Sequence, residues 1–177
     1  MRVTVTTVPQ QTRSVAHQES LDLHDDPGAI GRIDPARQYP TLRGLLLNLN
    51  DDGSPFSTLG CKVWVATEAP SAGTCEFASR VDLVVSQGMQ LGQAQYEDLA
   101  NRLAALLEPE PGDTLRVELQ ISPAAFSGGR QGFCMRLLLF STGEGQQQAQ
   151  VRWSFGLARV QQALLFLARA IRQGRLE

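Results

Sequence analysis

The chain has 177 residues, of which 42% are hydrophobic, so it can bury a substantial core without the help of disulfides or metal ions. Its formal net charge of −2 excludes a global electrostatic attraction to nucleic acid or acidic membranes. The charge is uneven, because residues 1–112 carry 8 basic and 14 acidic side chains and residues 113–177 carry 8 basic and 4 acidic ones. The C-terminal third could therefore face an anionic partner, although charge pairing within the chain is the commoner explanation.

Lys62 is the only lysine beside 15 arginines, which is typical of the codon usage of a GC-rich bacterial or phage genome.

The cysteines indicate a reducing compartment. Cys61, Cys75 and Cys134 lie in apolar runs without C-x-x-C spacing, so we expect reduced core thiols in a cytoplasmic protein. We expect neither a signal peptide nor a membrane partner, because the chain begins without a long apolar segment and no run is long enough to span a bilayer.

Residues 1–40 are predicted to form an extended N-terminal arm. RVTVTTV fits a short strand, but the residues after it are rich in Gln, Asp, Pro and Gly and have few adjacent apolar side chains. Such an arm would be ordered by packing on the domain or on a neighbouring chain. Its two histidines and nearby acidic residues could ligate a divalent ion, but a solvated acidic loop is far commoner, so no metal or cofactor is predicted.

Residues 41–177 are predicted to form an α+β domain. TLRGLLLNLN is expected to be a strand with Leu45, Leu47 and Leu49 on one face. GCKVWVATE and CEFASRVDLVV alternate with a period of two, which predicts two further strands. Apolar residues from Tyr96 to Leu107 then recur at helical spacing, and EPEPGD ends this helix.

The same order of elements is predicted to follow a second time. TLRVELQI, FCMRLLLF and AQVRWSF are expected to be strands, and a final helix turns Leu157 to Ile171 to one face. Both series begin with Thr-Leu-Arg, 73 residues apart, and the pairs Gly60 with Gly132 and Arg80 with Arg152 are each 72 residues apart. We predict a tandem βββα duplication, with half-units 41–112 and 113–177. We expect an antiparallel β-sheet, or two such sheets, with the two long helices packed on one face.

The sequence contains no recognised catalytic signature. It lacks G-x-S-x-G, G-x-x-x-x-G-K-[ST], H-E-x-x-H and G-x-G-x-x-G. A cysteine-dependent hydrolase using Cys61 or Cys134 would need a histidine of the arm to fold back over a strand, which makes it the least favoured alternative. We therefore predict no catalytic residues and favour a protein without enzymatic activity.

The favoured hypothesis is a binding or assembly subunit that acts through protein–protein contacts of the arm and the final helix. In that helix Leu165 and Phe166 fall outside the main apolar stripe, beside Arg169 and Arg172. A helix with apolar side chains on more than one side is usually covered on more than one side, here by the helix of the other half-unit, by a second copy of the chain or by a partner protein. The arginines also suit the negative end of the helix dipole.

The alternative is a single-stranded DNA- or RNA-binding protein that uses the outward face of the sheet. The side chains expected there are Lys62, Trp64, Arg80, Arg116, Arg136 and Arg152, and Arg130 in the loop SGGRQG could clamp a phosphate. Glu76, Asp82 and Glu118 are expected on the same face, where they would pair with the arginines. Tandem sheet-and-helix units are similar in layout to the whirly and PUR-repeat single-strand binders, although none of their motifs occurs here.

Overall fold

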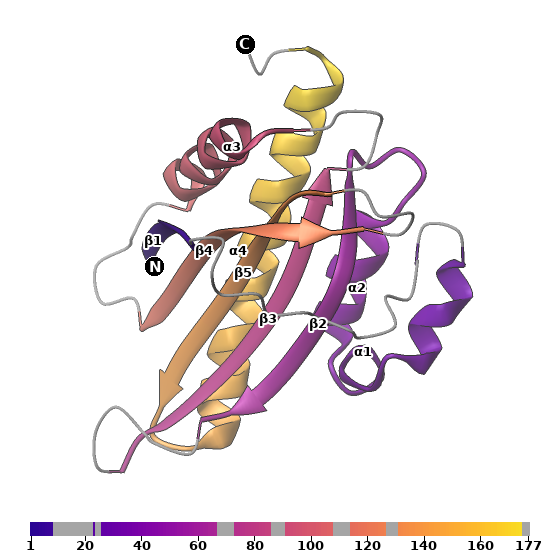
Figure 1. Cartoon of the computed structure of the whole chain (residues 1–177). Coiled ribbons are helices and arrows are strands. Elements are labelled where there is room, and N and C mark those ends of the chain that lie inside the picture. The colour runs from indigo at the N-terminus through magenta and orange to yellow at the C-terminus, as the bar shows by residue number, and fades with distance from the viewer. Residues whose placement is uncertain are drawn as a thin grey trace.

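The computed structural model describes residues 1–8, 23, 26–66, 73–85, 91–107, 114–126 and 131–174. Its elements in chain order are β1 (Arg2–Thr7), the 3-10 helix η1 (Pro27–Arg32), α1 (Asp34–Gln38), α2 (Pro40–Leu49), β2 (Phe56–Val65), β3 (Cys75–Val85), α3 (Gln93–Leu106), β4 (Leu115–Ala125), β5 (Gln131–Gly143) and α4 (Gln146–Arg172). The prediction of an α+β fold, with long helices on one face of a mostly antiparallel sheet, is confirmed (Figure 1).

The sheet has five strands in the order β1-β4-β5-β3-β2. β1 pairs with β4 in parallel, and all other neighbours are antiparallel. Because side chains alternate along each strand, one face is apolar and packs against the helices. The opposite face, which we call the outer face, carries polar and charged side chains along β4, whereas β5 contributes Arg136 between Leu138 and Cys134, with Phe140 further along.

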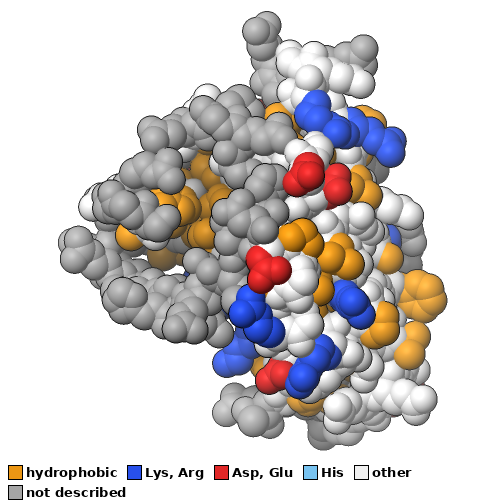
Figure 2. Space-filling model, turned by 90° about the vertical axis from the view of Figure 1, so that its right-hand side faces the viewer, with side chains coloured by type: hydrophobic (Ala, Val, Ile, Leu, Met, Phe, Trp, Pro, Cys, Tyr) orange, Lys and Arg blue, Asp and Glu red, His pale blue; other side chains and the backbone are white. Residues whose placement is uncertain are grey.

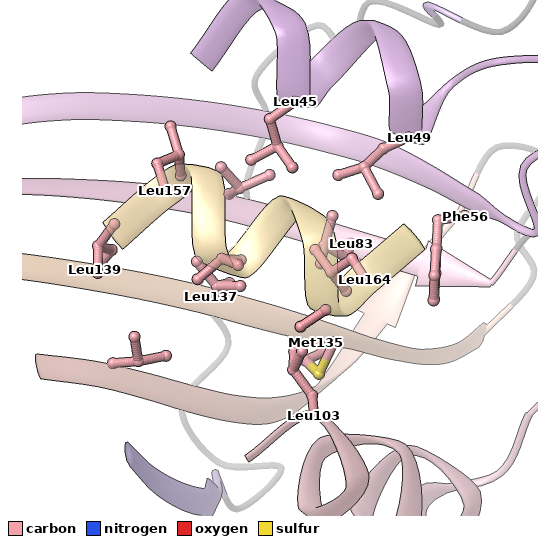
Figure 3. Close-up of a cluster of buried hydrophobic side chains, with 14 of the residues drawn as sticks. Leu45, Leu49, Phe56, Leu83, Leu103, Met135, Leu137, Leu139, Leu157 and Leu164 are labelled. Carbon is pink, nitrogen blue, oxygen red and sulfur yellow. The ribbon is translucent and has the colours of Figure 1, made fainter. Parts of the chain in front are cut away.

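Helix α4 runs along the apolar face of the sheet, with α2 on the side of β2 and α3 on the side of β1 (Figure 1). Figure 3 shows Leu45 and Leu49 of α2 beside Leu157 and Leu164 of α4, with Leu137 of β5 beneath them. All five side chains are at most 1% exposed. Each fully buried leucine contributes about 1.5–3 kcal/mol to folding, so this layer supplies much of the stability of the domain.

The start of α4 lies so close to β5 that a glycine is required there. A Cβ atom on Gly143 would lie 2.6 Å from the backbone nitrogen of Ala149. Ser141 Oγ donates a hydrogen bond of 2.6 Å to the carbonyl oxygen of Ala149. Seven residues after Ala149 in α4, a Cβ atom on Gly156 would lie 3.0 Å from Leu115 Cδ1. These contacts fix the line along which α4 crosses the sheet.

Trp153 of α4 is the largest fully buried side chain. Its indole N–H donates a hydrogen bond of 2.8 Å to Ser79 Oγ on β3. Its ring packs edge-on against Phe77 and Tyr39, with centroid distances of 5.1 and 5.4 Å. A buried indole needs a partner for its N–H, and Ser79 supplies it from the centre of the sheet.

The prediction of a strand at TLRGLLLNLN is wrong, because residues 40–49 form helix α2. Pro40 occupies the first turn of the helix, where a missing N–H has no cost. The buried side chains are Leu42, Leu45, Leu46 and Leu49, which follow the helical spacing i, i+3, i+4, i+7. Leu47, which a period of two would place on the same face as Leu45 and Leu49, is 39% exposed.

The prediction of a strand at AQVRWSF is also wrong, because residues 149–155 belong to the first turns of α4. Buried Ala149, Trp153, Leu157 and Val160 form one continuous helical stripe. The two Thr-Leu-Arg triplets therefore lie in a helix and in a strand, and Arg80 and Arg152 differ in the same way. The tandem βββα duplication is not confirmed.

The described parts of residues 1–40 are built into the fold. β1 forms one edge of the sheet, and Val3 and Val5 pack against the core. Ala29 and Ile30 of η1 and Ala36 of α1 are at most 5% exposed. These apolar residues are isolated in the sequence but converge on the core through short helices. Most of the acidic segment around the two histidines lies outside the described residues.

Candidate functional site

The outer face of the sheet brings together five of the residues predicted to contact nucleic acid. Strand alternation turns Lys62 and Trp64 of β2, Arg80 of β3, Arg116 of β4 and Arg136 of β5 away from the helices. The register places Lys62 opposite Arg80, and Arg136 opposite both Asp82 and Gln120. Figure 1 is drawn from the side of this face, with α4 behind the sheet.

Asp82 neutralises part of the positive charge on this face. Its carboxylate accepts a hydrogen bond of 2.8 Å from Arg136 Nε and lies 3.4 Å from Arg80 Nε, while its side chain is only 7% exposed. The Arg80 contact is an ion pair, and Arg80 Nε is buried without a hydrogen bond in the described structure. The single carboxylate of Asp82 thus pairs with two guanidinium groups, so the positive charge at this point of the face exceeds the negative charge.

Arg116 is balanced differently, because two carboxylates lie beside it. Its guanidinium pairs with Glu118, and its Nη2 lies 3.4 Å from Glu76 Oε2. Its Cζ atom lies 3.7 Å from the centre of the Phe140 ring, a cation–π contact. Phe140 in turn meets Trp64 edge-on, with a centroid distance of 6.2 Å. Arg116 therefore positions the aromatic pair, and its own charge is neutralised within the protein.

A hollow of about 300 Å³ opens on the outer face. Its lining side chains, which define what we call the basic hollow, are Lys62, Trp64, Arg80, Gln120, Arg136 and Leu138. Lys62 is exposed, Trp64 is half-buried, and Arg80 and Arg136 are 23% and 22% exposed. The three cations set against the Asp82 carboxylate leave a formal excess charge of 3 − 1 = +2.

Two predicted nucleic-acid contacts do not belong to this group. The placement of Arg152 on the sheet is wrong, because its segment is helical. Arg152 is in α4 and donates a hydrogen bond of 2.7 Å to the carbonyl oxygen of Thr142. Arg130 lies outside the described residues.

On the opposite side of the molecule, α3 and α4 enclose a groove of about 590 Å³. The residues that define this α3–α4 groove are Arg102, Ala105, Leu106, Phe166, Leu167, Arg169, Ala170 and Gln173. Phe166 and Arg169 were predicted as interface residues and line the groove. Leu106, expected in the core, is 43% exposed, and Phe166 is 58% exposed. Leu106 belongs to the apolar series from Tyr96 to Leu107 that was predicted for this helix, and it is the member of that series that the core does not cover.

The other two predicted interface residues lie away from the groove lining. Leu165 is half-buried, and Arg172 donates a hydrogen bond of 2.9 Å to the carbonyl oxygen of Gly53. Phe155, at 69% exposed, is a large apolar side chain on α4 that sequence reasoning missed because it was assigned to a strand. Figure 2 shows the side that carries α1, α2 and β2, where basic and acidic side chains are interspersed with hydrophobic ones. That side presents no single charge sign.

Neither Cys61 nor Cys134 is an activated nucleophile. Burial raises the pKa of the Cys61 thiol to about 11, although the positive charge of Arg80 acts in the opposite direction. Burial also raises the pKa of Cys134, whose Sγ lies 3.3 Å from Ser122 Oγ. Protonated thiols react slowly, and the described residues include no histidine to accept the proton. Nothing in these surroundings favours a cysteine-dependent hydrolase.

The described residues contain no group of three or more His, Cys, Asp or Glu side chains placed to hold a metal ion. Within the same part of the chain, no helix is long and apolar enough to cross a membrane. Comparison of the chain with protein-family models, with curated proteins and with solved structures finds no match. Function must therefore be argued from the two surfaces described above.

Proposed function

We propose that the chain is a non-enzymatic binding subunit whose α3–α4 groove receives an amphipathic helix of a partner protein. The observation that carries this proposal is the pair Leu106 and Phe166, which are 43% and 58% exposed on the two helices that border one groove. Single exposed apolar side chains are ordinary on protein surfaces. Here they share a groove whose floor includes Leu167 and Ala170. The described parts of the N-terminal segment pack into the domain, so the proposal rests on the groove alone.

The exposed stripe of α4 suits a helix as the occupant. Phe155, Gln162, Phe166, Arg169 and Gln173 are all exposed and are separated by seven, four, three and four residues. This is the spacing with which one helix presents a continuous face to another. The axial distance from Phe155 to Phe166 is about 16 Å, so a partner helix of three or more turns could contact both rings.

Charge favours an acidic partner over a second copy of the chain. α4 contains four arginines (Arg152, Arg159, Arg169 and Arg172) and no acidic residue. Arg102 is balanced by Asp98 at 2.7 Å, whereas Arg169 is exposed and makes no ion pair with any described residue. Two copies of α4 packed together would bring arginine against arginine, while a Glu-bearing helix would complement Arg169.

Burial of the two apolar side chains, Leu106 and Phe166, would contribute measurably to the free energy of binding a partner helix. Burial of the exposed parts of Leu106 and Phe166 contributes about 1–2 kcal/mol each. Anchors near the centre of an interface usually dominate its affinity, while the charged rim sets selectivity. We therefore expect the apolar contacts to control how tightly a helix binds and Arg169 to control which helix binds.

The test uses a synthetic amphipathic helix with leucines on one face and glutamates on the flanks, and a matched peptide with lysines instead of the glutamates. The full chain should bind the acidic peptide at least about tenfold more tightly in fluorescence anisotropy, a difference of about 1.4 kcal/mol. Phe166→Ala should weaken binding about tenfold, and Arg169→Glu should reverse the preference between the peptides. Leu47→Ala is the matched control, because Leu47 is a leucine on α2 that is 39% exposed outside the groove.

Three results would contradict the proposal. They are equal affinity for both peptides, no binding of either by the folded chain, and equal effects of Phe166→Ala and Leu47→Ala. Size-exclusion chromatography tests whether a second copy of the chain occupies the groove instead. A dimer that Phe166→Glu dissociates would assign the groove to a second copy, against the choice of an acidic partner.

A further inference from the structure

The basic hollow lies on the opposite side of the sheet from the α3–α4 groove and shares no residue with it. We propose that the basic hollow binds a nucleotide unit, with the phosphate between Lys62 and Arg136 and the base against Trp64. This activity would be independent of the helix-binding function proposed above, because different side chains on a different face would carry it.

The charge of the hollow matches one phosphate group. Lys62, Arg80 and Arg136 exceed the Asp82 carboxylate by two formal charges, which is sufficient for a phosphodiester of a strand, with about −1, or for a phosphate monoester, with about −1.5 to −2 near pH 7. Arg136 uses its Nε for Asp82, so its terminal nitrogens remain for an anion. Lys62 is exposed and makes no ion pair with a described residue, so it can turn toward a ligand without breaking a contact.

The rest of the lining calls for an organic, planar group beside the phosphate. A bare inorganic anion would leave Trp64 and Leu138 facing water. A base covers such side chains, and stacking on an aromatic ring contributes about 1–3 kcal/mol per base. Gln120 Nε2 donates a hydrogen bond of 3.4 Å to Glu118, so its carbonyl oxygen and its second N–H remain for the edge of a base. A phosphorylated serine peptide carries the same anion but has no ring for Trp64, so the lining favours the nucleotide.

The site is held in place before any ligand arrives. Asp82 holds Arg80 and Arg136 together from a buried position. The cation–π contact of Arg116 with Phe140, and the edge-on contact of Phe140 with Trp64, hold the indole at the rim. Groups fixed in this way lose little conformational entropy on binding, which separates this hollow from an ordinary solvated patch of arginines.

Tryptophan fluorescence reports on the site directly. The chain has two tryptophans, and Trp153 is fully buried against α2 and β3, so a ligand that quenches emission acts on Trp64. A single-stranded pyrimidine oligonucleotide of about 12 residues should quench the full chain at 50 mM salt. With one phosphate held between Lys62 and Arg136, its affinity should fall about threefold between 50 and 200 mM salt. Trp64→Phe should remove the quenching and weaken binding measured by anisotropy.

A charge-matched pair of variants separates specific contact from general attraction. Lys62→Ala and Arg169→Ala each remove one exposed positive charge, from the hollow and from the α3–α4 groove respectively. Lys62→Ala should weaken oligonucleotide binding and make its affinity less dependent on salt, because only Arg136 then faces the phosphate. Arg169→Ala should leave both unchanged. Because Arg169→Glu tests the helix groove, failure of one proposal can be told from failure of the other.

Lys62 also permits a chemical test, because it is the only lysine of the chain. An amine-acylating reagent followed by peptide mass spectrometry should show that a bound oligonucleotide protects Lys62, and that a double-stranded oligonucleotide of the same length protects it less.

A mononucleotide that binds as tightly as the oligonucleotide would support the nucleotide site and identify a free nucleotide as the ligand. Equal binding of a phosphoserine peptide, equal effects of Lys62→Ala and Arg169→Ala, or no binding at 50 mM salt by a chain with native circular dichroism would overturn the proposal.

Discussion

The indole N–H of Trp153 donates a hydrogen bond of 2.8 Å to the hydroxyl of Ser79, and both side chains are fully buried. The bond joins α4 to strand β3 across the apolar core. Ser79→Ala leaves a buried donor without an acceptor and should lower the free energy of unfolding by about 1–3 kcal/mol in urea titrations. The same change in a Trp153→Phe background should cost much less, since that ring has no N–H. Equal costs in the two backgrounds would show that the hydrogen bond is not the cause.

Gly143 is the position where α4 comes closest to the sheet. Gly143→Ala would place a methyl group 2.6 Å from the backbone nitrogen of Ala149, and neither backbone can move without shifting α4. We expect a loss of about 1–3 kcal/mol in the free energy of unfolding, measured by urea or thermal denaturation. Gly60→Ala is the control, because a Cβ atom there meets nothing within 4 Å. Similar stabilities of the two variants would contradict the close packing.

The thiol of Cys61 makes stability depend on alkaline pH. Its pKa rises from 9.0 to about 11 on folding, chiefly because burial disfavours the thiolate. The folded chain therefore holds this proton to a higher pH than the unfolded chain does. The stabilisation is fully present below pH 9 and is lost between pH 9 and 11, by at most about 3 kcal/mol. In Cys61→Ala the free energy of unfolding should fall less steeply over that window, although Tyr96 and Cys134 still contribute because their pKa values are also raised.

The outer face could be predicted from the sequence because it depends only on alternation. Arg116, Glu118 and Gln120 alternate with buried Val117 and Leu119 in β4, as the sequence pattern requires. The pairing of Asp82 with Arg136, in contrast, depends on the neighbouring positions of β3 and β5. Those positions are 54 residues apart in the chain and meet only through the sheet register. Local patterns could indicate which side chains point outward but not which of them meet.

The two mistaken strands have a common physical origin. In α2 and at the start of α4, short apolar runs fit a period of two as well as a helical period. At Pro40 the residue type decides, since proline favours the first turn of a helix. At Ala149 the deciding factor is tertiary, because the helical stripe from Trp153 to Ala168 packs against β3 and β5. Because of this error Phe155 was missed as an exposed residue and Arg152 was wrongly placed on the sheet.

Asp82 links the stability of the domain to the charge of the basic hollow. Asp82→Asn removes the carboxylate shared by Arg80 and Arg136 and should lower the free energy of unfolding by about 2–4 kcal/mol, because two partly buried guanidinium groups lose their counterion. The same change raises the excess charge of the hollow from +2 to +3, so oligonucleotide affinity at 50 mM salt should rise while stability falls. Glu118→Gln is the control of equal charge, and it should alter both quantities less, since Arg116 keeps Glu76 as a partner outside the hollow. Denaturant titrations and fluorescence binding on the same samples measure both effects. A folded Asp82→Asn chain with weakened binding would mean that the carboxylate is needed to aim the arginines, and the expected gain from charge would be refuted.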